Sequence, residues 1–103
     1  MLEAEPGLRH MDTPEFSVEA RPTSEAHLRA LKVYSSSHLD WTVLSPAAEF
    51  KPGERTERYR TSEGKLIRDE EGNCWISFED YAIAMIDEVE NPKFLRKHMA
   101  VAY

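Results

Sequence analysis

The chain has 103 residues, with 13 lysines and arginines against 19 aspartates and glutamates, and a net charge of −6. With 31% charged residues, no uncharged stretch approaches the roughly 20 residues of a membrane-spanning helix. An acidic chain also lacks the basic face that nonspecific nucleic-acid binding requires. We therefore expect one domain, or part of one, that binds neither membranes nor nucleic acids.

The single cysteine, Cys74, cannot form a disulfide within the chain. The four histidines are scattered and show no zinc-ligand spacing, so no metal site is expected. Residues 1–6 carry acids where a signal peptide needs a basic stretch followed by an apolar one. These features predict a cytoplasmic protein.

The first half of the chain predicts an irregular segment, a helix and a strand. Residues 1–23 hold three prolines in turn-like contexts and no helical period, although 8–11 has weak strand character. From Ser24 to His38, apolar residues recur at three- and four-residue spacing, which predicts an amphipathic helix that fades in a run of serines. Residues 41–45 are β-branched and aromatic without alternation, which is typical of a parallel strand buried on both faces.

The middle of the chain is polar and rich in turns. Residues 46–63 read as an exposed excursion with mixed charges. Residues 59–67 predict a small hairpin that turns at 62–64. A second turn is predicted at 69–73, followed by a short strand at 74–76.

The strongest local signal is a helix over residues 78–90. Ser77 followed by Asp80 resembles a capping box, and Asn91-Pro92 ends the helix. Its apolar residues fall on one stripe, which we expect to face the core: Phe78, Tyr81, Ala82, Met85, Ile86 and Val89. Residues 98–103 predict a terminal strand.

The residues offer no catalytic constellation. The four glycines stand far apart, so no glycine-rich turn for a pyrophosphate is present. No tyrosine has a lysine four residues later, the pair that lowers the tyrosine pKa in many short-chain dehydrogenases. Cys74 has acidic and apolar neighbours, which favours an inert thiol. His98 has no acidic residue at a spacing that would indicate a catalytic pair, and it is expected to meet solvent. We assign no catalytic residue.

Residues 40–50 are the most suggestive segment. A buried parallel strand that ends at Ser45 delivers a loop to the carboxyl edge of a sheet, where ligands bind in open α/β folds. A plain core strand is the alternative that spacing leaves open.

Several segments also carry a family resemblance: 39–48, 52–56 with Tyr59-Arg60, 76–82 and 101–103, together with 12–16 near the start. They are similar to segments in the C-terminal half of the NAD(P)-binding, NmrA-like atypical short-chain dehydrogenases/reductases, often labelled NADH-flavin reductases. The resemblance spans nearly the whole chain.

The resemblance implies an α/β fold, namely the C-terminal part of a Rossmann-like parallel sheet with a small β-hairpin excursion, its N-terminal dinucleotide-binding half absent. Residues 1–103 would form one partial domain, with 1–23 as an irregular lead-in and 24–103 as helix, strand, hairpin, helix and strand. It further implies a loop beside the nicotinamide of NAD(P), made of Ser45, Pro46, Ala47 and Ala48, and a substrate pocket lined by Phe50.

Two functions follow from the resemblance. The first is a fragment of an NAD(P)-dependent, NADH-flavin reductase-like oxidoreductase, inactive alone because the glycine-rich turn is missing; the intact family uses NAD(P) and a small acceptor such as a flavin. The second is a noncatalytic NmrA-like regulatory or protein-interaction module. Half a sheet would expose an edge and apolar surface, which favours a homo-oligomer.

Overall fold

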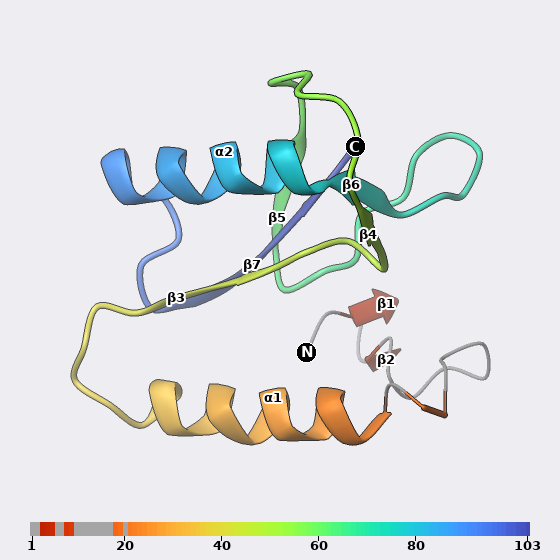
Figure 1. Cartoon of the computed structure of the whole chain (residues 1–103). Coiled ribbons are helices and arrows are strands. Elements are labelled where there is room, and N and C mark those ends of the chain that lie inside the picture. The colour runs from red at the N-terminus through yellow and green to blue at the C-terminus, as the bar shows by residue number, and fades with distance from the viewer. Residues whose placement is uncertain (1–2, 6–7, 10–17, 20) are drawn as a thin grey trace.

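The computed structural model describes residues 3–5, 8–9, 18–19 and 21–103. The elements, in chain order, are β1 (Glu3–Glu5), β2 (Leu8–Arg9), α1 (Arg21–Ser35), β3 (Thr42–Ser45), β4 (Glu49–Lys51), β5 (Arg60–Glu63), β6 (Trp75–Ser77), α2 (Phe78–Glu90) and β7 (Lys97–Ala102). Helices α1 and α2 lie on opposite sides of the β3–β7 strands (Figure 1). The predicted α/β class is confirmed.

The predicted irregular lead-in is only partly described. Residues 12–16, which carry part of the resemblance, lie outside the described residues. Within the described part, β1 and β2 pair as two antiparallel strands, and α1 begins at Arg21 rather than at Ser24. The early start has a local cause, because Pro22 in the first turn needs no amide partner and has a φ angle suited to a helix.

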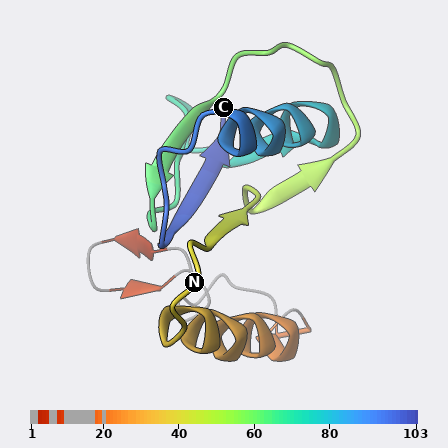
Figure 2. The ribbon, with the colours of Figure 1, turned by 90° about the vertical axis from the view of Figure 1, so that its left-hand side faces the viewer.

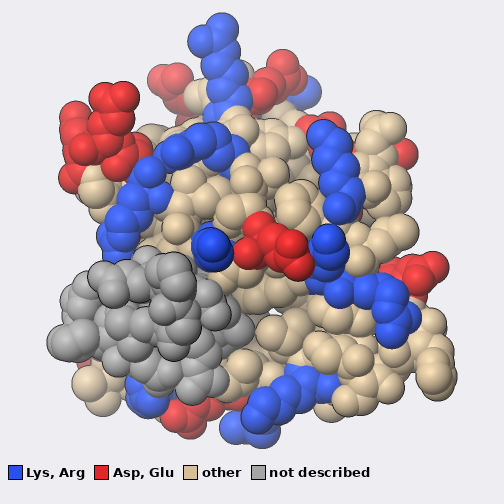
Figure 3. All heavy atoms as spheres, turned by 180° about the vertical axis from the view of Figure 1, so that it is seen from behind, with Lys and Arg blue, Asp and Glu red and all other residues tan. Residues whose placement is uncertain are grey.

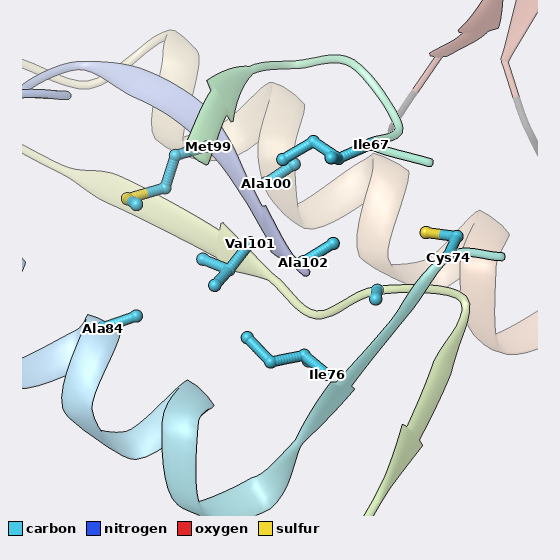
Figure 4. Packing of buried hydrophobic residues seen from close by; sticks show 9 residues of the cluster. Ile67, Cys74, Ile76, Ala84, Met99, Ala100, Val101 and Ala102 are labelled. Atoms are coloured by element: carbon cyan, nitrogen blue, oxygen red, sulfur yellow. The ribbon is translucent and has the colours of Figure 1, made fainter. Parts of the chain in front are cut away.

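Strand β7 is the centre of the main sheet. The strand order is β3-β7-β5, with β3 parallel and β5 antiparallel to β7, and Figure 2 shows β7 between its two neighbours. Residues Met99 to Ala102 are each at most 2% exposed. A strand paired on both edges has hydrogen-bond partners for its backbone N–H and C=O groups, so it can be buried on both faces. Val101 and Ile76 lie toward Ala84 of α2 in the core (Figure 4).

Strand β3 is parallel, as predicted, but it is not buried on both faces. All four of its residues, Thr42–Ser45, are half-buried. In the described part of the chain, β3 stands at the edge of its sheet and pairs only with β7. The prediction of full burial was wrong because an unalternating sequence does not reveal how many strands flank it.

The predicted hairpin over 59–67 does not form. Residues 60–63 form β5 and pair with β7, with Ser62 opposite Ala100. The chain turns away at Gly64, whose φ angle is +70° and whose backbone N–H donates to the His98 carbonyl at 2.8 Å. Pairing with the buried central strand is favoured over a local hairpin because it lets Ile67 enter the core, where it is 9% exposed.

A second, two-stranded parallel sheet joins β4 and β6, with Phe50 opposite Ile76. Sequence patterning missed β4, because residues 49–51 contain one apolar residue between two charged ones. Strand β6 was predicted over 74–76 and lies one residue later. The turn at 69–73 is confirmed, since the backbone N–H of Asp69 donates to the Asn73 carbonyl at 2.8 Å.

Helix α1 ends where its serines begin. The hydroxyls of Ser35, Ser36 and Ser37 donate to carbonyls of the preceding turn, at 2.7–2.9 Å. Such bonds compete with the helical backbone pattern. The guanidinium of Arg96 then fixes the connection to β3, because it donates to the carbonyls of Ser37 and Leu39, each at 2.9 Å.

The N-terminus of α2 is capped as predicted, but only half of the capping box forms. Ser77 Oγ accepts from the Asp80 backbone N–H at 3.0 Å. The Asp80 carboxylate does not return this bond. It accepts instead from the backbone N–H groups of Thr56 and Glu57, at 3.0 and 2.8 Å, from the Thr56 hydroxyl at 2.7 Å, and from the Tyr103 hydroxyl.

Asp80 is fully buried and charged. Burial is the largest influence on its pKa and would raise it, but the hydrogen bonds from Tyr103, Thr56 and Glu57 together outweigh burial, so its pKa is lowered. The buried carboxylate thus joins α2, the 56–57 loop and the end of β7.

The predicted apolar stripe of α2 mostly faces away from the core. Exposure is 44% for Phe78, 45% for Met85, 56% for Ile86 and 73% for Val89, whereas Ala84 is 2% exposed. The buried side of the helix carries Asp80 and Ala84, because the carboxylate finds its partners there and alanine allows close approach to the sheet. The expectation that this stripe packs on the core was wrong for Met85, Ile86 and Val89, which are exposed, whereas Tyr81 packs against the core and Phe78 packs on Phe50.

Replacing Asp80 with asparagine should destabilise the fold. Asp80→Asn keeps the size but removes the charge and one acceptor oxygen, so we expect a loss of roughly 2–4 kcal/mol in the free energy of unfolding. Urea unfolding followed by circular dichroism measures it. The control Glu90→Gln, at the exposed end of the same helix, should change stability by less than about 0.5 kcal/mol. Equal stability of Asp80→Asn and the parent chain would contradict the anchoring role.

Candidate functional site

The predicted cofactor loop leaves the carboxyl end of β3 and crosses to the second sheet. Ala47 is 4% exposed and belongs to the core, whereas Ala48 is exposed. The Ala48 backbone N–H donates to Cys74 Sγ at 3.4 Å, and the Glu49 N–H donates to the Cys74 carbonyl at 2.9 Å. Cys74 therefore holds the end of the loop, Ala47 anchors it in the core, and its start is held by the pairing of Ser45 with Ala100 of β7.

The structure pairs Ser45 with a histidine that the sequence did not suggest. Ser45 Oγ lies 2.5 Å from His98 Nε2. Because His98 is in register with Val43, and side chains two residues apart on a strand share a face, Ser45 and His98 project on the same side of the sheet. The expectation that His98 meets solvent is only partly correct, because the side chain is half-buried. The contact that covers it joins residues 53 apart in the chain, which no local pattern reveals.

Burial lowers the pKa of His98 from 6.5 to about 4. The imidazole is therefore neutral at pH 7. A neutral imidazole carries one N–H donor and one acceptor nitrogen, so the Ser45–His98 bond can run in either direction.

A hollow lies between α1 and the face of the sheet that carries Ser45 and His98. Helix α1 contributes Ala26, Ala30 and Leu31, and the strands contribute Val43, Ser45 and His98. Leu31 and His98 also line a second hollow, to which Trp41 contributes.

Phe50 lies on the other side. Its ring packs edge-on against Phe78, with centroids 4.4 Å apart and planes at 72°, and lies 4.9 Å from the ring of Tyr81. The Tyr81 hydroxyl donates to the Leu44 carbonyl at 2.9 Å. The four loop residues thus stay together, but the Ser45 side chain faces α1 and Phe50 faces α2.

Other titratable groups have structural partners. The Tyr59 hydroxyl donates to the Asp87 carboxylate, and burial together with Asp87 raises the pKa of Tyr59 to about 12. Cys74 is a buried free thiol. In the described ranges, no cluster of His, Cys, Asp and Glu is arranged to hold a metal ion. No helix in the same ranges is long and apolar enough to cross a membrane. On the face seen from behind, basic side chains lie beside acidic ones (Figure 3).

Comparison with known proteins gives strong matches over the whole chain. No family model matches. The chain is 41% identical over 95 residues to the uncharacterized protein YwnB of Bacillus subtilis. The aligned residues make up 90% of this chain and 45% of YwnB. The chain spans about half the length of the proteins that it matches.

Three solved structures share the fold. A "putative exported protein" from Burkholderia pseudomallei is 48% identical, with a TM-score of 0.95 over 99% of this chain and 50% of its own. A "putative epimerase" from Bacteroides thetaiotaomicron is 42% identical, with a TM-score of 0.87 over 99% and 48%. A "putative NADH-flavin reductase" from Streptococcus pneumoniae is 30% identical, with a TM-score of 0.90 over 98% and 50%. They confirm the partial Rossmann-like fold.

The half-buried His98 predicts a stability that falls in acid. Between pH 6.5 and about 4 the unfolded chain binds a proton at His98 and the folded chain does not, so unfolding is favoured as the pH falls through this window. Thermal melting at intervals from pH 7.5 to 4.5 measures the effect. His98→Asn, which retains a hydrogen-bonding group, should flatten the curve. The same pH dependence in both chains would contradict a half-buried neutral His98.

Proposed function

We propose that this chain, which resembles the C-terminal half of the NmrA-like atypical short-chain dehydrogenases/reductases, is part of an NAD(P)-dependent oxidoreductase of the NADH-flavin reductase type. The observation that carries this proposal is the similarity, over 98% of the chain, to the protein described as a "putative NADH-flavin reductase". A nicotinamide cofactor supplies hydride chemistry, and the protein supplies its binding and orientation.

Ser45, Pro46, Ala47 and Ala48 would form the wall beside the nicotinamide. Their place supports this role, because they follow the carboxyl end of a parallel strand. The loop contains no charged residue, so it suits an uncharged ring and not a phosphate. Ala47 would act through its backbone, since its side chain is buried.

Phe50 would line the pocket of the acceptor, for which a flavin is our proposal. The packing of Phe50 on Phe78 and Tyr81 supports this, because the three rings form an aromatic wall. Phe50 is 38% exposed and so leaves ring surface on which a flat molecule can stack.

By itself, the 103-residue chain should bind NAD(P) poorly or not at all, because it has no glycine-rich turn for the pyrophosphate. Calorimetric titration with NADPH and NADH tests this, and an affinity in the micromolar range would contradict it. Joining the chain to the half of the Streptococcus pneumoniae relative that it does not cover should create NADPH binding and flavin reduction. A folded hybrid that binds NADPH without reducing a flavin would contradict the proposal that a flavin is the acceptor.

The second candidate is a noncatalytic regulatory or protein-interaction module. The exposed face of α2, formed by Phe78, Met85, Ile86 and Val89, favours it. The edge of β3 that has no partner in the described part of the chain also favours it. Both candidates are proposed to act in the cytoplasm.

For this second candidate we expect a homo-oligomer that Ile86→Glu weakens, because a carboxylate placed in an apolar contact loses its hydration. Light scattering across a concentration series measures the mass. Glu90→Gln is the matched control on the same helix and should leave the mass unchanged. A parent chain that stays monomeric at every concentration would count against the interaction module.

A further inference from the structure

We propose that the hollow between α1 and the β3–β7 strands binds a small, uncharged, largely apolar molecule that carries a carbonyl oxygen. This site lies on the opposite side of the sheet from Phe50 and goes beyond the proposed function. It requires no NAD(P), so binding can be measured on the chain alone.

The walls of the hollow are mixed, with an apolar part next to polar groups. Besides Ser45 and His98, the polar groups come from His27, Tyr34 and Thr42. Ala26 and Ala30 stand one helical turn apart on α1, and Leu31 and Val43 complete the apolar surface. None of the described residues that line this hollow is Lys, Arg, Asp or Glu, although 31% of the chain is charged. Apolar surface with a few converging polar groups is typical of small-molecule sites, and no carboxylate, lysine or arginine of the described residues faces a ligand in this hollow.

The polar groups in the hollow favour a ligand that accepts a hydrogen bond. If neutral His98 donates from Nε2 to Ser45 Oγ, the serine hydroxyl proton is free to point into the hollow. Burial supports this arrangement by keeping the imidazole uncharged near pH 7. The free proton would meet a carbonyl oxygen of the ligand.

A second donor lies where the hollow continues past His98. Trp41 Nε1 is buried and has no hydrogen-bond partner among the described residues. Buried donors are nearly always paired, so an unpaired one calls for a missing acceptor. A ligand oxygen, or an ordered water held by the ligand, would supply it.

The charges in this continuation already have partners. Lys97 Nζ lies 3.8 Å from Glu63. The Arg96 guanidinium is held by the carbonyls of Ser37 and Leu39. The two carbonyls orient Arg96 but leave its positive charge in place, so the uncharged character of the ligand rests on the lining of the first hollow.

Acetophenone is a suitable probe, because it joins an aromatic ring to a carbonyl. The chain has two tryptophans, so the ¹⁵N-labelled protein shows two indole N–H signals by NMR, which Trp41→Phe assigns. We expect the Trp41 signal to shift saturably, with a dissociation constant in the roughly millimolar range expected of so small a ligand. The Trp75 signal should stay in place, because that ring packs against Tyr103 at 4.5 Å between centroids, away from the hollow.

Two matched probes test the proposed chemistry. Benzoate keeps the ring and adds a charge, and ethylbenzene keeps the ring and lacks the oxygen. Each should bind at least roughly tenfold more weakly than acetophenone, since one good hydrogen bond or one unmet charge has an effect of this size. Equal binding of benzoate or ethylbenzene, or no shift of the Trp41 signal with acetophenone, would overturn the proposal.

Two alanine substitutions test the location. Ala30→Leu fills the hollow and should abolish the shift, whereas Ala82→Leu, on an exposed position of α2, should leave it unchanged. Circular dichroism confirms that both variants fold, and the indole signal of Trp41 reports local structure in case Ala30→Leu alters the helix. Unchanged binding by a folded Ala30→Leu chain would place the ligand elsewhere and overturn the proposal.

Discussion

The buried carboxylate of Asp80 is the interaction on which the rest of the described structure depends. It lies at the positive end of the α2 dipole, where a negative charge is favoured, and accepts hydrogen bonds from the 56–57 loop and from Tyr103. Ser77 Oγ lies 2.8 Å from the same tyrosine hydroxyl. Because Tyr103 directly follows β7, and β7 pairs with both β3 and β5, this network fixes the sheet to the helix.

Local signals predicted the parts of the fold that depend on neighbouring residues. The bounds of α2, its Ser77 cap and the turn at 69–73 each follow from interactions within a few residues. The partners in the pairing of β5 with β7 are 36 to 42 positions apart, from Glu63 with Met99 to Arg60 with Ala102. The contact of Ser45 with His98 spans 53 positions, and no local pattern encodes either one. Sequence patterning identified Asp80 as half of a capping box, but its real partners lie 23 and 24 residues away.

The apolar face of α2 shows the limit of periodicity as a guide to burial. A period of 3.6 residues correctly groups Phe78, Met85, Ile86 and Val89 on one side, but it does not say what covers that side. The structure packs the opposite side, with Ala84, on the sheet.

The sheet divides the chemistry of this chain between two faces. The α2 side offers aromatic rings around Phe50, which suit stacking on a flat ligand, whereas the α1 side offers the Ser45–His98 pair and an apolar wall, which suit hydrogen bonding to an uncharged one. The loop from Ser45 to Ala48 joins the two faces, and its anchors at Ala47 and Cys74 restrict its movement. The Ser45 side chain faces α1, and the chain reaches the α2 side five residues later at Phe50.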